Sequence, residues 1–242
     1  MTITDQTAQL TQTAPADAST PATAFTAFWL FQADSTRPSL SEAEREQIGQ
    51  SMLDAIARYG KTVKIHAAYS TTGLSTGVDL ILWVTADDCE SIQRLASEIH
   101  RSPAGRALSL RQVYLGVASE SQYDPEHTPA FLKGLAPRKY LSVYPFVKTP
   151  AWYLLPYERR RELMIEHGQM GQEYPTIQTN TVNSFGIADQ EFIVALEDDD
   201  PHTLVKMVQR LRAAEVRVYT QVDTPIYLGL LTDLREAVLN AL

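Results

Sequence analysis

Residues that could carry chemistry gather in the second half of this chain, beginning with Tyr144 and Lys148 in the run YPFVK. Side chains alternate along a β-strand, so two residues four apart point to the same face. A phenol there could give up a proton or a hydrogen atom, and a lysine beside it favours an anionic ligand. The alternative for Tyr144 is a packed tyrosine at the rim of a sheet.

His167 is the next candidate, and the segment around it, RRRELMIEHGQMGQE, has the periodicity of an amphipathic helix. Leu163, His167, Met170 and Tyr174 recur at helical spacing and form one stripe. A neutral imidazole on a rigid helix is a suitable axial ligand for a metal or a haem iron. The alternative is a histidine packed in the core with a backbone partner.

Two glycines close to His167 favour the ligand over the core histidine. Gly168 and Gly171 both fall inside the expected helix, where each glycine costs up to ~1 kcal/mol. They also remove side chains, so that a large flat group can approach the helix. We therefore expect His167 to hold such a group.

His127 lies in DPEHTPAF, between the two halves of the chain. An imidazole with a pKa of about 6.5 could act as a general acid or base at the mouth of a pocket. An exposed loop histidine is the alternative. Trp152, in the following turn, is a large ring of a type that usually packs.

Composition limits the class of protein. The chain has 242 residues, 44% of them hydrophobic, and a formal net charge of −8, which allows a sizeable core and argues against binding to nucleic acid. Cys89 is the single cysteine, which fits the cytoplasm. No segment is apolar enough to span a membrane. Phosphate loops, dinucleotide-binding glycines and nucleophile elbows are absent, and the acidic run 197–200 is expected to be a solvated turn and helix cap.

The elements that must position these residues follow the order βαββαβ twice. In the first half we expect strands at 23–34, 63–70, 78–86 and 110–118 and helices at 39–60 and 88–102. In the second half we expect a strand at 139–148, a helix at 156–173, a hairpin at 179–198, a helix at 200–214 and a strand at 222–231. The chain thus divides into a disordered tail (1–24), two halves (25–120 and 139–232) joined by a linker (121–138), and a C-terminal tail (233–242).

Such a repeat predicts an α+β fold of two ferredoxin-like halves that pack sheet against sheet. The helices then lie outside a closed β-barrel. A pocket between sheet and helix in the second half is the natural ligand site.

The motifs YPFVK, WYLLP, EHG, YP and NTVNSF occur in this order, and with them the chain resembles the coproheme decarboxylases, in the actinobacterial-type branch of the chlorite dismutase superfamily. The resemblance runs from residue 25 to residue 232 and is densest over 126–186. It implies a dimeric α+β barrel that assembles as a homopentamer in the cytoplasm.

The activity implied by the resemblance is an oxidoreductase reaction. The family binds iron coproporphyrin III (coproheme) without a covalent link and uses hydrogen peroxide to decarboxylate two propionates to vinyls. The product is haem b, in the last step of coproporphyrin-dependent haem biosynthesis. A transient contact with the ferrochelatase that supplies coproheme is a further implication.

Residue roles come from the same resemblance. His167 matches the proximal iron ligand, Tyr144 the tyrosine that takes hydrogen from the propionate, Lys148 a basic residue near the propionates, and His127 the distal base towards peroxide. Further contacts to the cofactor are expected from Trp152, Met164, Gly171 and Asn180.

Asn180 also separates this chain from the chlorite dismutases. They carry a distal arginine thirteen residues after the proximal histidine, and here that position is Asn180, so little chlorite decomposition is expected. Other haem enzymes, such as a peroxidase, and a non-catalytic haem carrier or sensor are the rival interpretations. A chain that binds no haem is a third. Arg210, Arg212 and Arg217 are further candidates for holding propionates.

Overall fold

The structure is a computed structural model that describes residues 24–34, 36, 39–118 and 128–242. The N-terminal half follows the expected order, with one additional short helix. Its elements are β1 (Ala24–Ala33), α1 (Glu42–Tyr59), β2 (Val63–Ser70), β3 (Leu80–Ala86), α2 (Cys89–Arg101), α3 (Pro103–Ala107) and β4 (Leu108–Ala118).

The C-terminal half repeats this order after the 3₁₀ turn η1 (Ala130–Lys133). Its last expected strand is divided in two, and a final helix follows. The elements are β5 (Tyr140–Lys148), α4 (Pro150–Leu154), α5 (Tyr157–Gln172), β6 (Gln178–Asn183), β7 (Phe192–Asp198), α6 (Pro201–Leu211), η2 (Glu215–Tyr219), β8 (Thr220–Val222), β9 (Tyr227–Leu231) and α7 (Leu234–Asn240).

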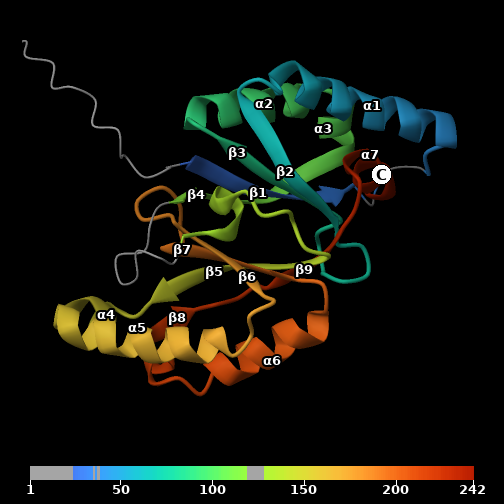
Figure 1. The fold of residues 1–242 in the computed structure, drawn as a ribbon. Helices are drawn as coiled ribbons and strands as arrows, with labels where there is room; N and C mark the ends of the chain where they lie inside the picture. Colours follow the sequence, from blue (N-terminus) through green and yellow to red (C-terminus); the bar gives the residue numbers. More distant parts are fainter. Residues whose placement is uncertain (1–23, 35, 37–38, 119–127) are drawn as a thin grey trace, which may run out of the picture.

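Strands of the two halves close into one barrel (Figure 1). Each half contributes four strands, in the equivalent orders β4-β1-β3-β2 and β9-β5-β7-β6. The halves join where β2 pairs with β9 and where Val117 of β4 pairs with Asn183 of β6. Strand β8 adds to the outside of β5. The expected tandem ferredoxin-like α+β fold is confirmed.

Alternation along the strands creates separate cores inside and outside the barrel. Phe28, Trp83 and Val143 point inward and meet in a cluster that both halves share. Their strand neighbours, such as Trp29, point outward beneath α1 and α2. The helices α5 and α6 cover the C-terminal half in the same way (Figure 1). The C-terminal half therefore has a layer between sheet and helices, where the candidate residues were expected.

The helix boundaries follow from capping residues visible in the sequence. The Ser41 side chain accepts a hydrogen bond from the Glu44 backbone N–H, and the Glu44 carboxylate accepts one from the Ser41 N–H. This reciprocal pair fixes the start of α1. Asp200 caps α6 through the His202 N–H, with Pro201 in the first turn. The start of α6 agrees with the helix expected from residue 200, whereas α1 begins at Glu42 and not at residue 39 as expected.

The C-terminal tail expected at 233–242 is instead largely helical. Asp233 caps α7, and Ala237 and Val238 are buried in the outer core of the N-terminal half. The chain therefore returns to its first half after completing the second. Within the described residues, no helix is long and apolar enough to cross a membrane.

Candidate functional site

Strand β5 carries Tyr144 and Lys148 on the face of the sheet that α5 and α6 cover. Tyr144 packs in the cluster of Val194 and the α6 side chains, whereas its neighbour Val143 faces the barrel interior. Four residues further on, the Lys148 ammonium lies over the Trp152 ring in the helix layer. The shared face expected from strand alternation is therefore what the structure shows.

The Tyr144 hydroxyl makes no hydrogen bond to any residue in the described part of the chain. Burial raises the pKa of Tyr144 to about 12; the negative charge of Asp223 adds to this, and Arg212 and Arg217 oppose it. The phenol is therefore protonated at neutral pH. Its O–H is available to a ligand in this layer.

Lys148 is a buried cation, with 7% of the residue exposed. Its Nζ lies 4.4 Å from the centre of the Trp152 ring and 5.1 Å from that of Phe146, and it makes no ion pair with a carboxylate of the described residues. Burial lowers the pKa of Lys148 to about 8; Arg217 lowers it further, and Glu191 acts in the opposite direction. An anion placed beside this ammonium would supply the charge partner that it lacks.

Glu191 belongs to the wall of the site, although it was not singled out in the sequence. One of its carboxylate oxygens accepts the Lys148 backbone N–H at 2.7 Å and the Tyr153 hydroxyl at 2.5 Å. This contact joins the end of β5 to α4 and to the turn before β7. No sequence signal marks Glu191, because its partners come from separate elements.

An ion-pair cluster lies next to Tyr144. Arg212, at the end of α6, and Arg217, in η2, both pair with Oδ2 of Asp223, the latter at 3.2 Å. Arg212 and Arg217 were proposed from the sequence. Arg210 does not join them, because its guanidinium pairs with Glu173 on the outer surface. Asp223 was missed, because it follows the short strand β8 and carries no local motif.

Helix α5 places His167 on its inner side. Leu163 is buried, and Met170 packs against the same cluster. Tyr174 packs beside Tyr144 in the neighbouring cluster. His167 itself is half-buried. The stripe expected from the sequence thus lies between the helix and the sheet, and His167 belongs to the helix that covers the Tyr144 face.

The two glycines of α5 are not required by contacts with the rest of the protein. A Cβ at Gly168 would meet nothing within 4 Å, and one at Gly171 would lie 3.8 Å from Met207 Cε, an ordinary contact. Met164 and Trp152 both belong to the layer beneath α5: Met164 is partly buried, and Trp152 is 2% exposed. Trp152 therefore packs the layer as well as facing Lys148.

Asn180 lies on the other face of the sheet. It pairs with Ala195 of the barrel interior, and its side chain accepts the Phe131 N–H and donates to Glu197. It is fully buried there. Asn180 therefore does not share the Tyr144 face, and its contact with the cofactor stays a prediction. On β6, Thr181 pairs with Val194 and so shares the Tyr144 face.

The acidic run 197–200 is only partly what the sequence indicated. Asp200 caps α6, but Glu197 is 1% exposed and accepts hydrogen bonds from the Tyr69 hydroxyl at 2.6 Å and the Arg138 N–H. The solvated turn was therefore wrong for Glu197, which joins the two halves inside the barrel. Burial raises the pKa of Glu197, against the effect of these donors. His127 lies outside the described residues.

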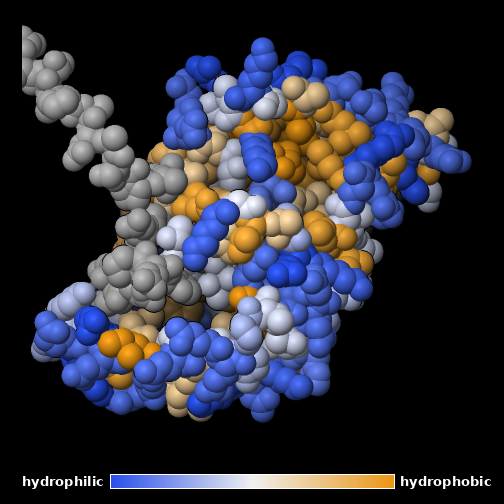
Figure 2. Space-filling model, in the orientation of Figure 1, coloured by the Kyte–Doolittle hydropathy of each residue, from blue (hydrophilic) through white to orange (hydrophobic). Residues whose placement is uncertain are grey.

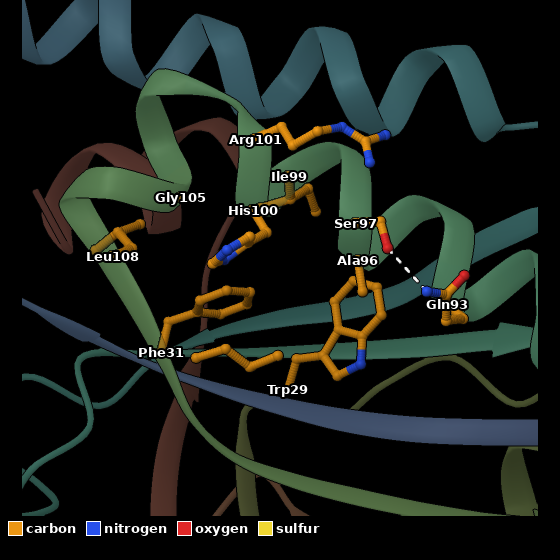
Figure 3. A pocket seen from close by; sticks show the side chains of 11 residues that line it. Trp29, Phe31, Gln93, Ala96, Ser97, Ile99, His100, Arg101, Gly105 and Leu108 are labelled. Carbon is orange, nitrogen blue, oxygen red and sulfur yellow. Dashed lines mark hydrogen bonds between the residues drawn. The ribbon is translucent and has the colours of Figure 1, made fainter.

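The N-terminal half offers an internal comparison. A hollow of about 330 Å³ lies between α2 and strands β1 and β4, in the elements equivalent to those that hold Tyr144, Arg212 and Arg217. Figure 3 shows its floor of Trp29 and Phe31, with His100 over Phe31. The floor of this hollow carries Trp29 and Phe31, whereas β5 carries Tyr144 and Lys148. The phenol and lysine of β5 therefore have no counterpart on this floor.

The residues of the C-terminal layer fit an iron tetrapyrrole that carries carboxylates. Three cations (Lys148, Arg212 and Arg217) face two carboxylates (Asp223 and Glu191), which leaves an excess of positive charge for an anionic ligand. A histidine on the covering helix suits axial ligation. The space-filling view shows the surface hollowed between the α4–α5 layer and the sheet above it (Figure 2).

Comparison with known proteins agrees with this geometry. The family model described as chlorite dismutase matches residues 45–232. A coproheme decarboxylase from Mycolicibacterium smegmatis is 35% identical over 170 residues, which cover 70% of this chain and 74% of that protein. Another from Staphylococcus saprophyticus is 30% identical over 166 residues, 62% of this chain and 66% of that protein.

Solved structures share the fold. A mutant chlorite dismutase from Candidatus Nitrospira defluvii superposes with a TM-score of 0.80 at 25% identity, covering 89% of this chain and 94% of that one. A second mutant of the same enzyme, in complex with cyanide, gives 0.82 at 23% identity, covering 90% and 94%.

Proposed function

Because the chain belongs to the chlorite dismutase family, we propose that it is a coproheme decarboxylase, which converts iron coproporphyrin III to haem b with hydrogen peroxide as the oxidant. The observation that carries this proposal is a buried phenol, Tyr144, on the same face as a buried cation, Lys148; among the residues that the structure describes, the phenol has no hydrogen-bond partner and the cation has no carboxylate partner. The names of the two curated relatives support the same activity.

Binding is assigned to residues on both sides of the layer. His167 would hold the iron from α5, and Lys148 would hold a propionate from β5. The missing side chains at Gly168 and Gly171 leave room beside His167 for the macrocycle. Trp152 and Met164 would exclude water from this region, which strengthens the interaction between ammonium and carboxylate. When bound, the iron supplies the oxidising equivalents of peroxide.

Tyr144 would carry the hydrogen transfer. Its raised pKa keeps the oxygen protonated at neutral pH, and no hydrogen bond within the described chain must be broken before a substrate approaches. Lys148 on the same face would fix the propionate close to this phenol. His127, assigned as the base that deprotonates peroxide, rests on the family resemblance alone.

The reaction balances with one peroxide for each propionate. Each –CH₂CH₂COOH becomes –CH=CH₂. The bond to the carboxyl carbon breaks to release CO₂, one hydrogen leaves the carbon attached to the ring, and this hydrogen and the acid proton complete the reduction of H₂O₂ to two waters. Two such cycles give haem b. The two electrons lost by each propionate are those gained by the peroxide.

Product masses test the proposal directly. Purified protein is mixed with iron coproporphyrin III and titrated with hydrogen peroxide; two successive losses of a carboxyl group, ending at haem b, are expected. Tyr144→Phe should bind the substrate and give no product. Tyr140→Phe, four residues earlier on β5 and in the same cluster, is the matched control and should react normally. A spectral change on binding without loss of mass would identify a carrier or sensor instead.

Chlorite decomposition is the second candidate, since the solved relatives bear that name. The position that matches the distal arginine of chlorite dismutases is Asn180, and its side chain faces the barrel interior. None of the residues of β6, Gln178–Asn183, is an arginine, so this strand offers no guanidinium to the Tyr144 face. Oxygen release from chlorite, followed with an electrode, is expected to be negligible.

Assembly and location follow from the family resemblance alone. We propose a cytoplasmic homopentamer that receives coproheme through a transient contact with a ferrochelatase. Sedimentation of the purified protein tests the pentamer. The contact would be refuted if the two purified proteins formed no detectable complex and if no coproheme passed from one to the other.

A further inference from the structure

Two arginines beside Tyr144 share one carboxylate. The nearest contacts of Arg212 and Arg217 to Asp223 are both made to its Oδ2. The Asp223 side chain is 17% exposed, and those of Arg217 and Arg212 are 34% and 40% exposed. Two guanidiniums on one carboxylate leave several N–H donors for a second acid group.

Arg217 is the more exchangeable of the two. Its contact to Asp223, at 3.2 Å, is the longer one, and its positive charge acts on Lys148 as well as on Tyr144. Arg212 acts on Tyr144 and stands at the end of α6, where its backbone N–H closes the helix. A carboxylate bound between Arg217 and Lys148 would therefore lie close to the phenol.

We propose that Asp223 is a carboxylate that occupies Arg217 in the free protein and is displaced from it by a carboxylate of the substrate, while Arg212 retains Asp223. Arg217 then determines specificity for a carboxylated porphyrin, and Asp223 is a positioning residue. The identity of the porphyrin rests on the proposed function. The exchange itself rests on the shared carboxylate and on the excess of positive charge.

The exchange explains how an arginine-rich layer stays ordered before substrate arrives. Arg212, Arg217 and Lys148 would repel one another without a counter-charge. Asp223 supplies that charge from the segment after β8, next to the strand pair β5–β8. A substrate carboxylate brings a second negative charge, so Asp223 is no longer needed by both arginines.

The test uses metal-free coproporphyrin III, so that its result depends on neither iron nor oxidant. Affinity is measured by porphyrin fluorescence at pH 7, for the tetracarboxylate and for its uncharged tetramethyl ester delivered from the same detergent. Arg217→Gln should weaken binding of the tetracarboxylate by about tenfold or more, because a charged hydrogen bond is lost. Ester binding should be unchanged.

Asp223→Asn should strengthen binding of the tetracarboxylate by about fivefold, because the competing charge is removed from a partly exposed pair. This gain should disappear in the Arg217→Gln background, as a double-mutant cycle requires of an exchange at Arg217. Arg210→Gln is the control, since Arg210 lies on the same helix but pairs with Glu173. It should change neither affinity.

Weaker or unchanged binding in Asp223→Asn would overturn the exchange and leave Asp223 with a structural role only. A gain that persists in the Arg217→Gln background would also overturn it, in favour of a diffuse charge effect. Should Arg217→Gln not fold, Arg217→Lys retains the charge without the planar fork, and the Asp223→Asn result still decides. If the wild-type protein binds and decarboxylates coproheme but the variants bind as the wild type does, only the exchange is refuted. If the wild-type protein binds neither porphyrin, the proposed function is refuted as well.

Discussion

Replacing Lys148 with methionine should stabilise the folded protein and lower its affinity for a carboxylated ligand. The pKa of Lys148 is lowered from 10.5 to about 8, and each pH unit of pKa corresponds to about 1.4 kcal/mol, so keeping this ammonium charged in the folded state costs about 3 kcal/mol. Loss of the contact with the Trp152 ring offsets up to about 2 kcal/mol. The variant Lys148→Met is therefore expected to gain about 1 to 3 kcal/mol at pH 7.

The pH dependence gives a sharper test of the same cause. Between pH 8 and 10.5 the unfolded chain keeps the Lys148 proton and the folded chain has lost it, so wild-type stability rises with pH across this window. Methionine does not titrate. The difference in free energy of unfolding between Lys148→Met and the wild type should therefore shrink by about 3 kcal/mol as the pH rises through this window. Urea unfolding of both proteins at pH 7 and pH 10 measures the difference.

Ligand binding should move in the opposite direction. A carboxylate needs the protonated amine, so affinity for metal-free coproporphyrin III should fall as the pH rises past about 8, and this fall should be missing in Lys148→Met. Lys206→Met, on the exposed side of α6, is the matched control for both measurements. Destabilisation of Lys148→Met at pH 7, or a stability difference that is independent of pH, would refute the reasoning.

His167→Ala should lose affinity for iron coproporphyrin III while retaining that for the metal-free porphyrin, as compared by absorbance titration, because only the iron needs the imidazole. Tyr69→Phe should lower the free energy of unfolding by about 1 to 3 kcal/mol in urea, since it removes a donor from the buried Glu197 carboxylate. Glu197→Gln should gain stability relative to the wild type in urea as the pH rises from acid to neutral, because the pKa of Glu197 is raised on folding and its carboxylate opposes folding once the pH exceeds the pKa of the unfolded state. Asp200→Ala should cost about 1 kcal/mol in thermal unfolding through loss of the α6 cap.

Local sequence signals were sufficient to predict the helices and strands and the shared face of two site residues. The Ser41 capping box, the Asp200–Pro201 start and the repeated βαββαβ order fixed helices and strands close to their observed positions. Strand alternation was enough to put Tyr144 and Lys148 on one face. Periods of 2 and 3.6 residues are properties of the local backbone, and so they can be read without knowing the fold.

Spacing along the chain did not determine on which face of the sheet Asn180, thirteen residues after His167, would lie. One residue of register in a strand reverses the face on which a side chain lies, and the segment between α5 and β6 sets that register. The pairing of Asn180 with Ala195, and of Thr181 with Val194, shows the outcome. Only the sheet could decide it.

The amino-acid sequence by itself determined the fold class, the family and the residue types available for chemistry. The tertiary structure decided which charges meet. Asp223 joins Arg212 and Arg217 from three separate elements, Glu191 reaches the end of β5, and Glu197 is buried between the halves rather than solvated. Electrostatic interactions depend on distance through space and on burial, and neither quantity is encoded in the spacing of residues along the chain.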